Sequence, residues 1–117
     1  MRIVSQSHAI LHCLRAPVGG LFRHVRDLAT EQAKLGHKVG VLVDSSTADS
    51  LTESRLEEFA QHLELGLHRT AIGRNPGWRD IQAVSATKQL ASNLFIDVLH
   101  GHGAKGGALA RLAGQSL

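Results

Sequence analysis

The sequence predicts an α/β protein, in which a parallel β-sheet carries helices on both of its faces. Two observations predict this fold class. Short apolar runs that suit buried strands alternate four times with longer segments of helical periodicity, and glycine clusters stand between strands and the helices that follow. The chain contains three Phe, one Trp and no Tyr, which is typical of an aliphatic core and not of an aromatic-rich β-sandwich. Its 117 residues suit one domain, spanning residues 1–117.

The first strand–helix unit opens with residues 9–14 (AILHCL), which are apolar at nearly every position. Such a run is expected for a strand that is buried on both faces inside a parallel sheet. From Leu21 to Leu35 the apolar residues recur at helical spacing, with charged residues mainly on the other side. Gly36 stands where a helix often ends on a glycine, so we expect the helix to end there.

The second unit begins with a strand at residues 38–43 (KVGVLV). Ser50 and Glu53 have the spacing of a capping box, in which two side chains satisfy the first free N–H groups of a helix. We therefore expect a second helix from this point to about Leu65, with Gly66 ending it.

The third and fourth units follow the same pattern. Residues 67–72 (LHRTAI) alternate in polarity as a strand does, and Asn75 and Pro76 are a typical N-cap and first helical residue. This third helix is expected to extend to Leu94. Residues 96–100 (IDVLH) form the fourth predicted strand, and a glycine-rich turn leads into a last helix.

The composition excludes several classes of protein. The net charge of +3 is small and spread along the chain, and aromatic stacking residues are scarce, so we expect no nucleic-acid partner. The single cysteine, Cys13, cannot form an internal disulfide, which favours a reducing cytoplasm. No apolar run approaches the roughly 20 residues of a membrane span, and the first residues do not form a signal peptide. We therefore predict no transmembrane segment.

The first glycine-rich turn, residues 16–20 (APVGG), follows the first strand directly. Glycines at this point let the backbone approach a ligand, and the free N–H groups of the next helix attract phosphate or another anion. The alternative is that Gly19 and Gly20 only permit a tight turn. The turn lacks the third glycine of the dinucleotide fingerprint and the Lys-Ser/Thr of a P-loop. Without that fingerprint, Asp44 at the end of the second strand suits a loop or capping role, and NAD is disfavoured.

The second glycine-rich turn, residues 100–107 (HGHGAKGG), follows the fourth strand. A neutral imidazole here can hydrogen-bond a ligand or act as a general acid–base, with Lys105 and the next helix N-terminus facing an anion. We assign this role to His102, and expect His100 to be a strand-end residue with its hydrogen bonds satisfied.

A zinc site was the other interpretation of this histidine pair. Structural zinc needs four protein ligands and catalytic zinc usually three, and the sequence identifies no third ligand beside His100 and His102. We predict no metal. His12 and Cys13 lie inside the first strand and are expected to be a hydrogen-bonded core residue and a small buried hydrophobe, respectively.

The two turns, read with their flanking residues as LRAPVGGLFRHVRDLA and DVLHGHGAKGGALARLA, resemble the N-terminal domain of a family 4 glycosyltransferase of the GT-B fold. The resemblance covers nearly the whole chain. It implies a Rossmann-like open parallel sheet of about four strands in the order 3-2-1-4. It also implies transfer of a sugar from a nucleotide-diphosphate donor to an acceptor, usually with retention, and without a metal or other cofactor.

The resemblance further implies roles for individual residues. Gly19 and Gly20 would approach the donor diphosphate, and the catalytic residue His102 would contact the donor sugar near the reacting centre. Lys105, Gly106 and Gly107 would lie on the same rim on the diphosphate side. Loops on the acceptor side of the site would carry Arg15, Asp44, Arg74 and Trp78.

Such an enzyme has two Rossmann-like domains, with the active site between them, and this sequence covers roughly the first half of the first domain. The C-terminal domain, which holds the donor diphosphate and ribose, would be a partner, and we expect no transferase activity from this chain alone. The fourth strand would then be an exposed edge suited to forming a homodimer. We expect a cytoplasmic protein at the inner face of the membrane. The alternative function is a non-catalytic α/β module that binds an anion or a partner.

Overall fold

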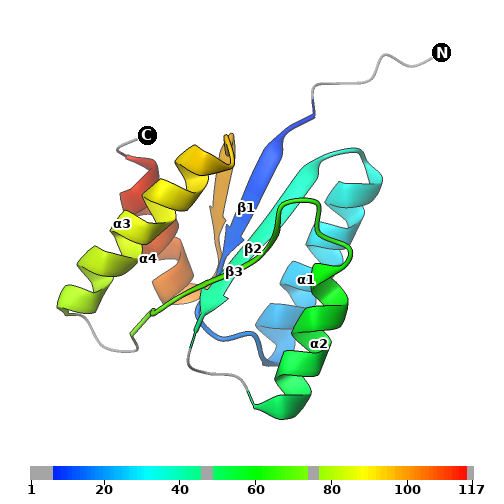
Figure 1. The fold of residues 1–117 in the computed structure, drawn as a ribbon, viewed down its shortest axis with the longest axis horizontal. Helices are drawn as coiled ribbons and strands as arrows, with labels where there is room; N and C mark the ends of the chain where they lie inside the picture. Colours follow the sequence, from blue (N-terminus) through cyan, green and yellow to red (C-terminus); the bar gives the residue numbers. More distant parts are fainter. Residues whose placement is uncertain (1–6, 46–48, 74–76, 116–117) are drawn as a thin grey trace.

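The computed structural model of the chain describes residues 7–45, 49–73 and 77–115, and its centre is a four-stranded sheet (Figure 1). All strand pairings are parallel, and the spatial order is β3-β2-β1-β4. The predicted α/β class and the order implied by the resemblance are both confirmed. The strands are β1 (Ala9–Cys13), β2 (Lys38–Asp44), β3 (Gly66–Thr70) and β4 (Val98–Gly101).

Helices cover both faces of the sheet, with α1 and α2 on one face and α3 and α4 on the other (Figure 1). Each face has its own apolar cluster. Phe22 and Phe59 pack in the cluster below α1 and α2, and Ala83 and Leu109 pack in the cluster below α3 and α4. None of the helices in the described part of the chain has the length and apolar character needed to cross a membrane. They are α1 (Gly19–Lys34), α2 (Ser50–Ala60), α3 (Trp78–Asn93) and α4 (Gly103–Gly114).

Strand β1 lies between β2 and β4, and all five of its residues are buried. Burial on both faces is the physical reason for its nearly continuous apolar sequence. Leu11 and Cys13 join the cluster below α3 and α4. His12, between them in the strand, lies on the opposite face, where the Gln32 side chain of α1 contacts it. His12 is therefore a polar group built into the centre of the sheet.

The start of α2 differs from the prediction. The capping box of Ser50 and Glu53 was wrong, because Asp49 is the N-cap and its Oδ1 accepts a hydrogen bond from the backbone N–H of Thr52 at 2.8 Å. Glu53 instead pairs with Arg69 of β3 through two contacts of 2.6 and 2.7 Å. With Asp49 as the N-cap, Glu53 lies one residue beyond the N3 position of a capping box, and its side chain forms a tertiary ion pair instead.

Other element ends shift by a few residues. Gly66 begins β3 and has a φ of +83°, while the predicted fourth strand is displaced along the chain and begins at Val98. Helix α3 begins at Trp78, and the predicted cap residues Asn75 and Pro76 lie outside the described residues.

Two glycines let α4 approach the sheet at its carboxyl end. A Cβ on Gly106 would collide with the carbonyl group of Cys13, and a Cβ on Gly101 would collide with the backbone of Gly106 and Gly107. The same close approach allows the backbone N–H of His102 to donate to the carbonyl oxygen of Cys13 at 2.9 Å. The lack of side chains at Gly101 and Gly106 thus sets the position of α4 against β1 and β4.

The Gly106→Ala variant should be destabilised, because its methyl group forces the α4 backbone away from β1. We expect a loss of about 1–3 kcal/mol of unfolding free energy, measured by urea denaturation. Gly107→Ala is the matched control, since nothing lies within 4 Å of a Cβ at that position. It should keep its stability or gain about 0.5–1 kcal/mol from higher helix propensity. Equal stability of the two variants would contradict the packing role of Gly106.

Candidate functional site

The candidate site lies at the carboxyl ends of β1 and β4. After β1 the chain turns to α1 on one face of the sheet, and after β4 it turns to α4 on the opposite face. Helices α1 and α4 therefore begin at the same edge of the sheet, at the lower edge in Figure 1. This is the switch point at which ligands bind in open α/β sheets.

The two helices at the switch point differ from the other two in how they begin. The N-caps of α1 and α4, Val18 and His102, make no side-chain capping hydrogen bond, and neither helix has an acidic residue in its first turn. Helix α2 is capped by Asp49, and in α3 the Asp80 side chain accepts from the N–H of Gly77 at 3.1 Å. Uncapped N–H groups and unopposed helix dipoles make the switch point electropositive.

Gly19 and Gly20 are the first residues of α1, and both are exposed. Nothing lies within 4 Å of a Cβ placed on either of them. Gly19 has a φ of +73°, which explains glycine at that position by backbone conformation. Gly20 has neither a positive φ nor a close neighbour, so no packing or backbone constraint in the described chain explains why it is glycine.

His102 is brought into contact with other histidines from β1 and β4. It is only 6% exposed, its Nε2 lies 2.9 Å from Nδ1 of His12, and its ring stacks on that of His100 at 4.1 Å between centroids. The ring of His24 on α1 meets it edge-on at 6.0 Å. Burial, with smaller contributions from His100, His12 and His24, lowers the pKa of His102 to about 4. His102 is therefore a neutral imidazole at neutral pH.

His12 is completely buried and connects His102 to α1. Its Nε2 lies 2.7 Å from Oε1 of Gln32. Burial lowers the pKa of His12; the hydrogen bond to Gln32 opposes this, and His100 and His24 reinforce it. The prediction of a hydrogen-bonded core histidine was correct, but its link to the site was missed. The signal for that link was the parallel pairing of β1 and β4, which places His12 directly beside His100.

The histidine cluster of His12, His100 and His102 is the group of described residues that could hold a metal, since its nitrogen atoms lie within 4.8 Å of one another. The sequence pattern identified no third ligand beside His100 and His102, and the pairing of β1 with β4 brings His12 to that position. However, His12 and His102 use their facing nitrogens in a mutual hydrogen bond, and the ring of His100 stacks on that of His102. A shared ion would require these rings to rotate, so the geometry is that of a hydrogen-bonded cluster.

A family model described as a glycosyl transferase 4-like domain matches residues 19–117. The chain belongs to this glycosyl transferase 4-like family. Its fold is similar to that in the crystal structure of a glycosyltransferase from Rickettsia africae ESF-5, with a TM-score of 0.67 and 14% sequence identity. That match covers 97% of this chain and 28% of the Rickettsia chain. No curated protein sequence matches significantly.

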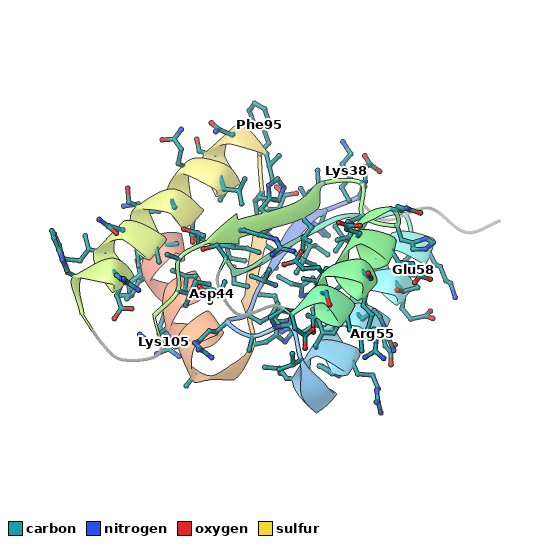
Figure 2. All side chains as sticks on the ribbon, turned by 60° about the horizontal axis from the view of Figure 1, so that its bottom comes forward. Lys38, Asp44, Arg55, Glu58, Phe95 and Lys105 are labelled. Carbon is teal, nitrogen blue, oxygen red and sulfur yellow. The ribbon has the colours of Figure 1, made fainter. Side chains whose placement is uncertain are left out.

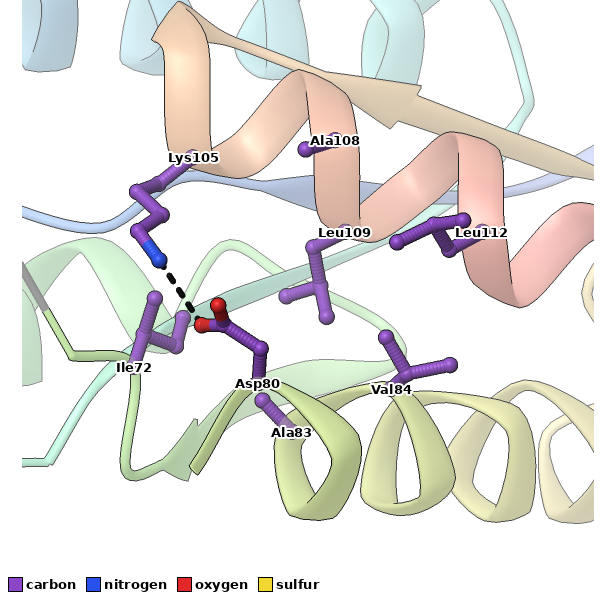
Figure 3. A pocket seen from close by; sticks show the side chains of 8 residues that line it. All are labelled: Ile72, Asp80, Ala83, Val84, Lys105, Ala108, Leu109 and Leu112. Carbon is purple, nitrogen blue, oxygen red and sulfur yellow. Dashed lines mark hydrogen bonds and ion pairs between the residues drawn. The ribbon is translucent and has the colours of Figure 1, made fainter. Parts of the chain in front are cut away.

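Lys105, predicted on the diphosphate side of this glycosyl transferase 4-like domain, is engaged by α3. Its Nζ donates to Oδ1 of Asp80 at 2.7 Å, across a small cavity of about 60 Å³ between α3 and α4 (Figure 3). This hydrogen bond is the largest cause of the lowered pKa of Asp80. A donor contact would require Lys105 to leave this ion pair. Gly106 is buried against Cys13, so packing alone explains why this residue is glycine.

Of the residues predicted on the acceptor side, Arg15 and Asp44 lie side by side, because the backbone N–H of Asp44 donates to the carbonyl oxygen of Arg15 at 3.0 Å. Arg15 is half-buried, and its Nε is fully buried without a hydrogen-bond partner in the described part of the chain. Asp44 is 2% exposed and accepts a hydrogen bond from the backbone N–H of Ile72 at 2.8 Å, which indicates a structural role. Trp78 is largely exposed at the start of α3, and Arg74 lies outside the described residues.

A cationic groove beside Gly19 was not predicted. Arg23 and Arg26 of α1 and Arg55 of α2 line it together with Thr52, around a volume of about 250 Å³. In Figure 2, where the lower edge of Figure 1 comes forward, Arg55 projects from α2 beside α1. The helical spacing of Arg23 and Arg26 was visible in the sequence, but the contribution of α2 depends on the packing of the two helices.

The depressed pKa values of His102 and His12 predict a loss of stability in mild acid. The unfolded chain binds protons near the ordinary pKa of 6.5, whereas in the folded chain burial lowers the pKa of His12 and lowers that of His102 to about 4. The unfolded state therefore binds more protons in this window, and folding weakens as the pH falls. The groups facing His102 are His12, His100 and His24, and all of them are histidines.

Urea denaturation should show a loss on the order of 2 kcal/mol between pH 7.5 and pH 5 from His102 alone. His102→Asn should remove much of this loss. His62→Asn, which replaces an exposed histidine outside the cluster, should retain it. If His102→Asn and the unmodified chain lose the same stability between pH 7.5 and pH 5, the loss does not come from His102.

Proposed function

We propose that this domain forms one side of the active site of a glycosyltransferase that moves a sugar from a nucleotide-diphosphate donor to an acceptor. One observation carries the proposal. In a glycosyl transferase 4-like domain, the two uncapped helix N-termini and the buried His102 meet at the switch point of the sheet. This is an arrangement for binding an anion beside a neutral hydrogen-bonding group.

In the proposed reaction the diphosphate lies against the first turn of α1. The free N–H groups at Gly19 and Gly20 and the helix dipole stabilise the negative charge that develops as the diphosphate departs. The absence of side chains lets the backbone approach the phosphate oxygens. Lys105 contributes a positive charge when it exchanges Asp80 for the donor.

His102 contacts the sugar of the donor next to the bond that breaks. Because its pKa of about 4 leaves the ring neutral, His102 acts by hydrogen bonding and not as a cation. The reaction draws on no metal or other cofactor. The nucleotide and the remaining diphosphate contacts belong to a C-terminal domain, so the 117-residue chain alone is inactive.

The acceptor enters from the side of α1 and α2. Arg15 and Arg74 remain the proposed acceptor contacts among the predicted residues, and the groove of Arg23, Arg26 and Arg55 provides a further basic surface. The buried Asp44 serves the fold instead. We place the protein in the reducing cytoplasm, at the inner face of the membrane, where anionic acceptors can meet this surface.

Binding of a nucleotide diphosphate tests the role of the α1 turn. Titration of the chain with UDP and with GDP should shift the NMR signals of the Gly19, Gly20 and His102 amides. Gly20→Val should weaken this binding by at least about tenfold, because the side chain blocks the approach of the diphosphate. Its folding stability should be kept, since a Cβ there meets nothing. Gly114→Val, at an exposed position at the opposite end of α4 from the switch point, is the control. Unchanged affinity in Gly20→Val would contradict the proposal.

Sugar transfer tests the function as a whole. The chain alone should show no turnover of any nucleotide sugar, and a protein that joins it to a donor-binding C-terminal domain of this family should be active. In that protein His102→Ala should lower kcat by about 100-fold or more. Turnover by the chain alone, or full activity of His102→Ala, would overturn the assigned roles. A chain that binds the anion but never supports transfer is a non-catalytic binding module.

The exposed edge of the sheet provides a further expectation. In the described chain β4 pairs with β1 on one side only, and Val98 and Phe95 are 40% and 85% exposed. Unpaired backbone groups beside apolar side chains favour pairing with a second copy. We expect concentration-dependent dimers in sedimentation velocity. Val98→Lys should shift them to monomers. Leu35→Lys, which replaces another exposed apolar side chain at the end of α1, should not. A strictly monomeric chain at high concentration would refute this.

A further inference from the structure

Three side chains from three different elements form a continuous hydrogen-bonded chain behind the candidate site, with both histidines buried and Gln32 half-buried. Gln32 of α1 bonds His12 of β1, with Oε1 and Nε2 2.7 Å apart. His12 in turn bonds His102 at the N-cap of α4, with Nδ1 and Nε2 2.9 Å apart. The three residues are separated by up to 90 positions along the sequence.

The direction of each hydrogen bond follows from the first. Oε1 of Gln32 can only accept, so Nε2 of His12 carries the proton. A neutral His12 then has a bare Nδ1, which accepts, and Nε2 of His102 must donate to it. The burial of both rings, which lowers both pKa values, keeps them neutral. One amide oxygen on α1 thus decides which nitrogen of His102 holds its proton.

The remaining nitrogen of His102, Nδ1, is left as an acceptor. It makes no hydrogen bond in the described part of the chain, and the side chain does not cap α4. Arg15 Nε is the single fully buried side-chain nitrogen or oxygen there that lacks a partner, so Nδ1 of His102 is reached by solvent. His100 packs against the ring face at 4.1 Å and limits its rotation.

We propose that Gln32 and His12 are positioning residues that hold His102 in the Nε2-protonated tautomer and present its Nδ1 lone pair to a hydroxyl group of the bound sugar. The role assigned to the sugar hydroxyl rests on the proposed function. The tautomer itself does not, because it is a property of the unliganded domain. A hydroxyl donor is the matching partner, since a lone pair on a neutral imidazole accepts a proton and cannot bind an anion.

The tautomer can be measured on the chain without any ligand. Long-range ¹H–¹⁵N NMR spectra of the imidazole rings distinguish a protonated from a bare ring nitrogen. We expect a protonated Nε2 and a bare Nδ1 at His102 near neutral pH. In Gln32→Leu the acceptor for His12 is lost, and the ratio of the two His102 tautomers should fall by about tenfold. Gln32→Glu still accepts and should restore the wild-type spectrum.

Gln89→Leu is the matched control, because it replaces a glutamine side chain on the exposed face of α3. It should leave the His102 ring signals unchanged. Gln32 is only half-buried, so Gln32→Leu is expected to fold, and well-dispersed amide spectra verify this. A protonated Nδ1 at His102 in the wild-type chain, or an unchanged tautomer ratio in folded Gln32→Leu, would overturn the proposal.

A second measurement separates the role of the Gln32–His12–His102 hydrogen-bonded chain from the proposed function. In the two-domain protein, Gln32→Leu should lower kcat by about tenfold while Gln32→Glu retains it, with little change in the affinity for UDP. A shifted tautomer together with unchanged kcat would overturn the assignment of Nδ1 to the sugar. Failure of UDP to bind at Gly20 would count against the proposed function and leave the tautomer result standing.

Discussion

The contact between Gly106 and the carbonyl group of Cys13 sets the geometry on which the rest of this domain depends. Because no side chain separates α4 from β1, the two backbones come close enough for the N–H of His102 to bond the carbonyl of Cys13 at 2.9 Å. The side chain of His102 then meets that of His12 one residue earlier in β1. A side chain at position 106 would move α4 outward and separate the rings of His12 and His102. The helix packing and the geometry of the candidate site therefore both depend on Gly106.

The polar groups at the switch point differ from those in the rest of the fold. Elsewhere the described helices begin with acidic caps, as Asp49 and Asp80 show, and the strands bury aliphatic side chains. At the switch point two helices begin without such caps, and three histidines lie together with lowered basicity at His12 and His102. Burying neutral imidazoles costs stability unless they are hydrogen-bonded. The Gln32–His12–His102 chain meets that requirement and leaves one nitrogen free for a ligand.

Much of the fold followed from local patterns in the sequence. The four strand–helix units, the buried β1 and the inert Cys13, whose burial raises its pKa to about 12, were all predictable from apolar periodicity and glycine position. The predicted cap was wrong because a side chain has two competing partners: Glu53 has the capping-box spacing from Ser50 but pairs with Arg69. Lys105 likewise pairs with Asp80 in the domain without ligand, and its contact with the donor diphosphate stays a prediction. Local spacing does not reveal which partner a long charged side chain selects.

The sequence by itself determined the fold class and the switch point, and it singled out His102 and the two glycine turns as candidate site residues, because these depend on the order of elements and on residues adjacent in the chain. Tertiary structure decided the rest. It placed Gln32 and His12 behind His102, gave Gly106 a packing role and buried Asp44 in the fold. These outcomes depend on strand register and on helix–sheet distance, since contacts between residues as many as 90 positions apart leave no periodic signal in the chain.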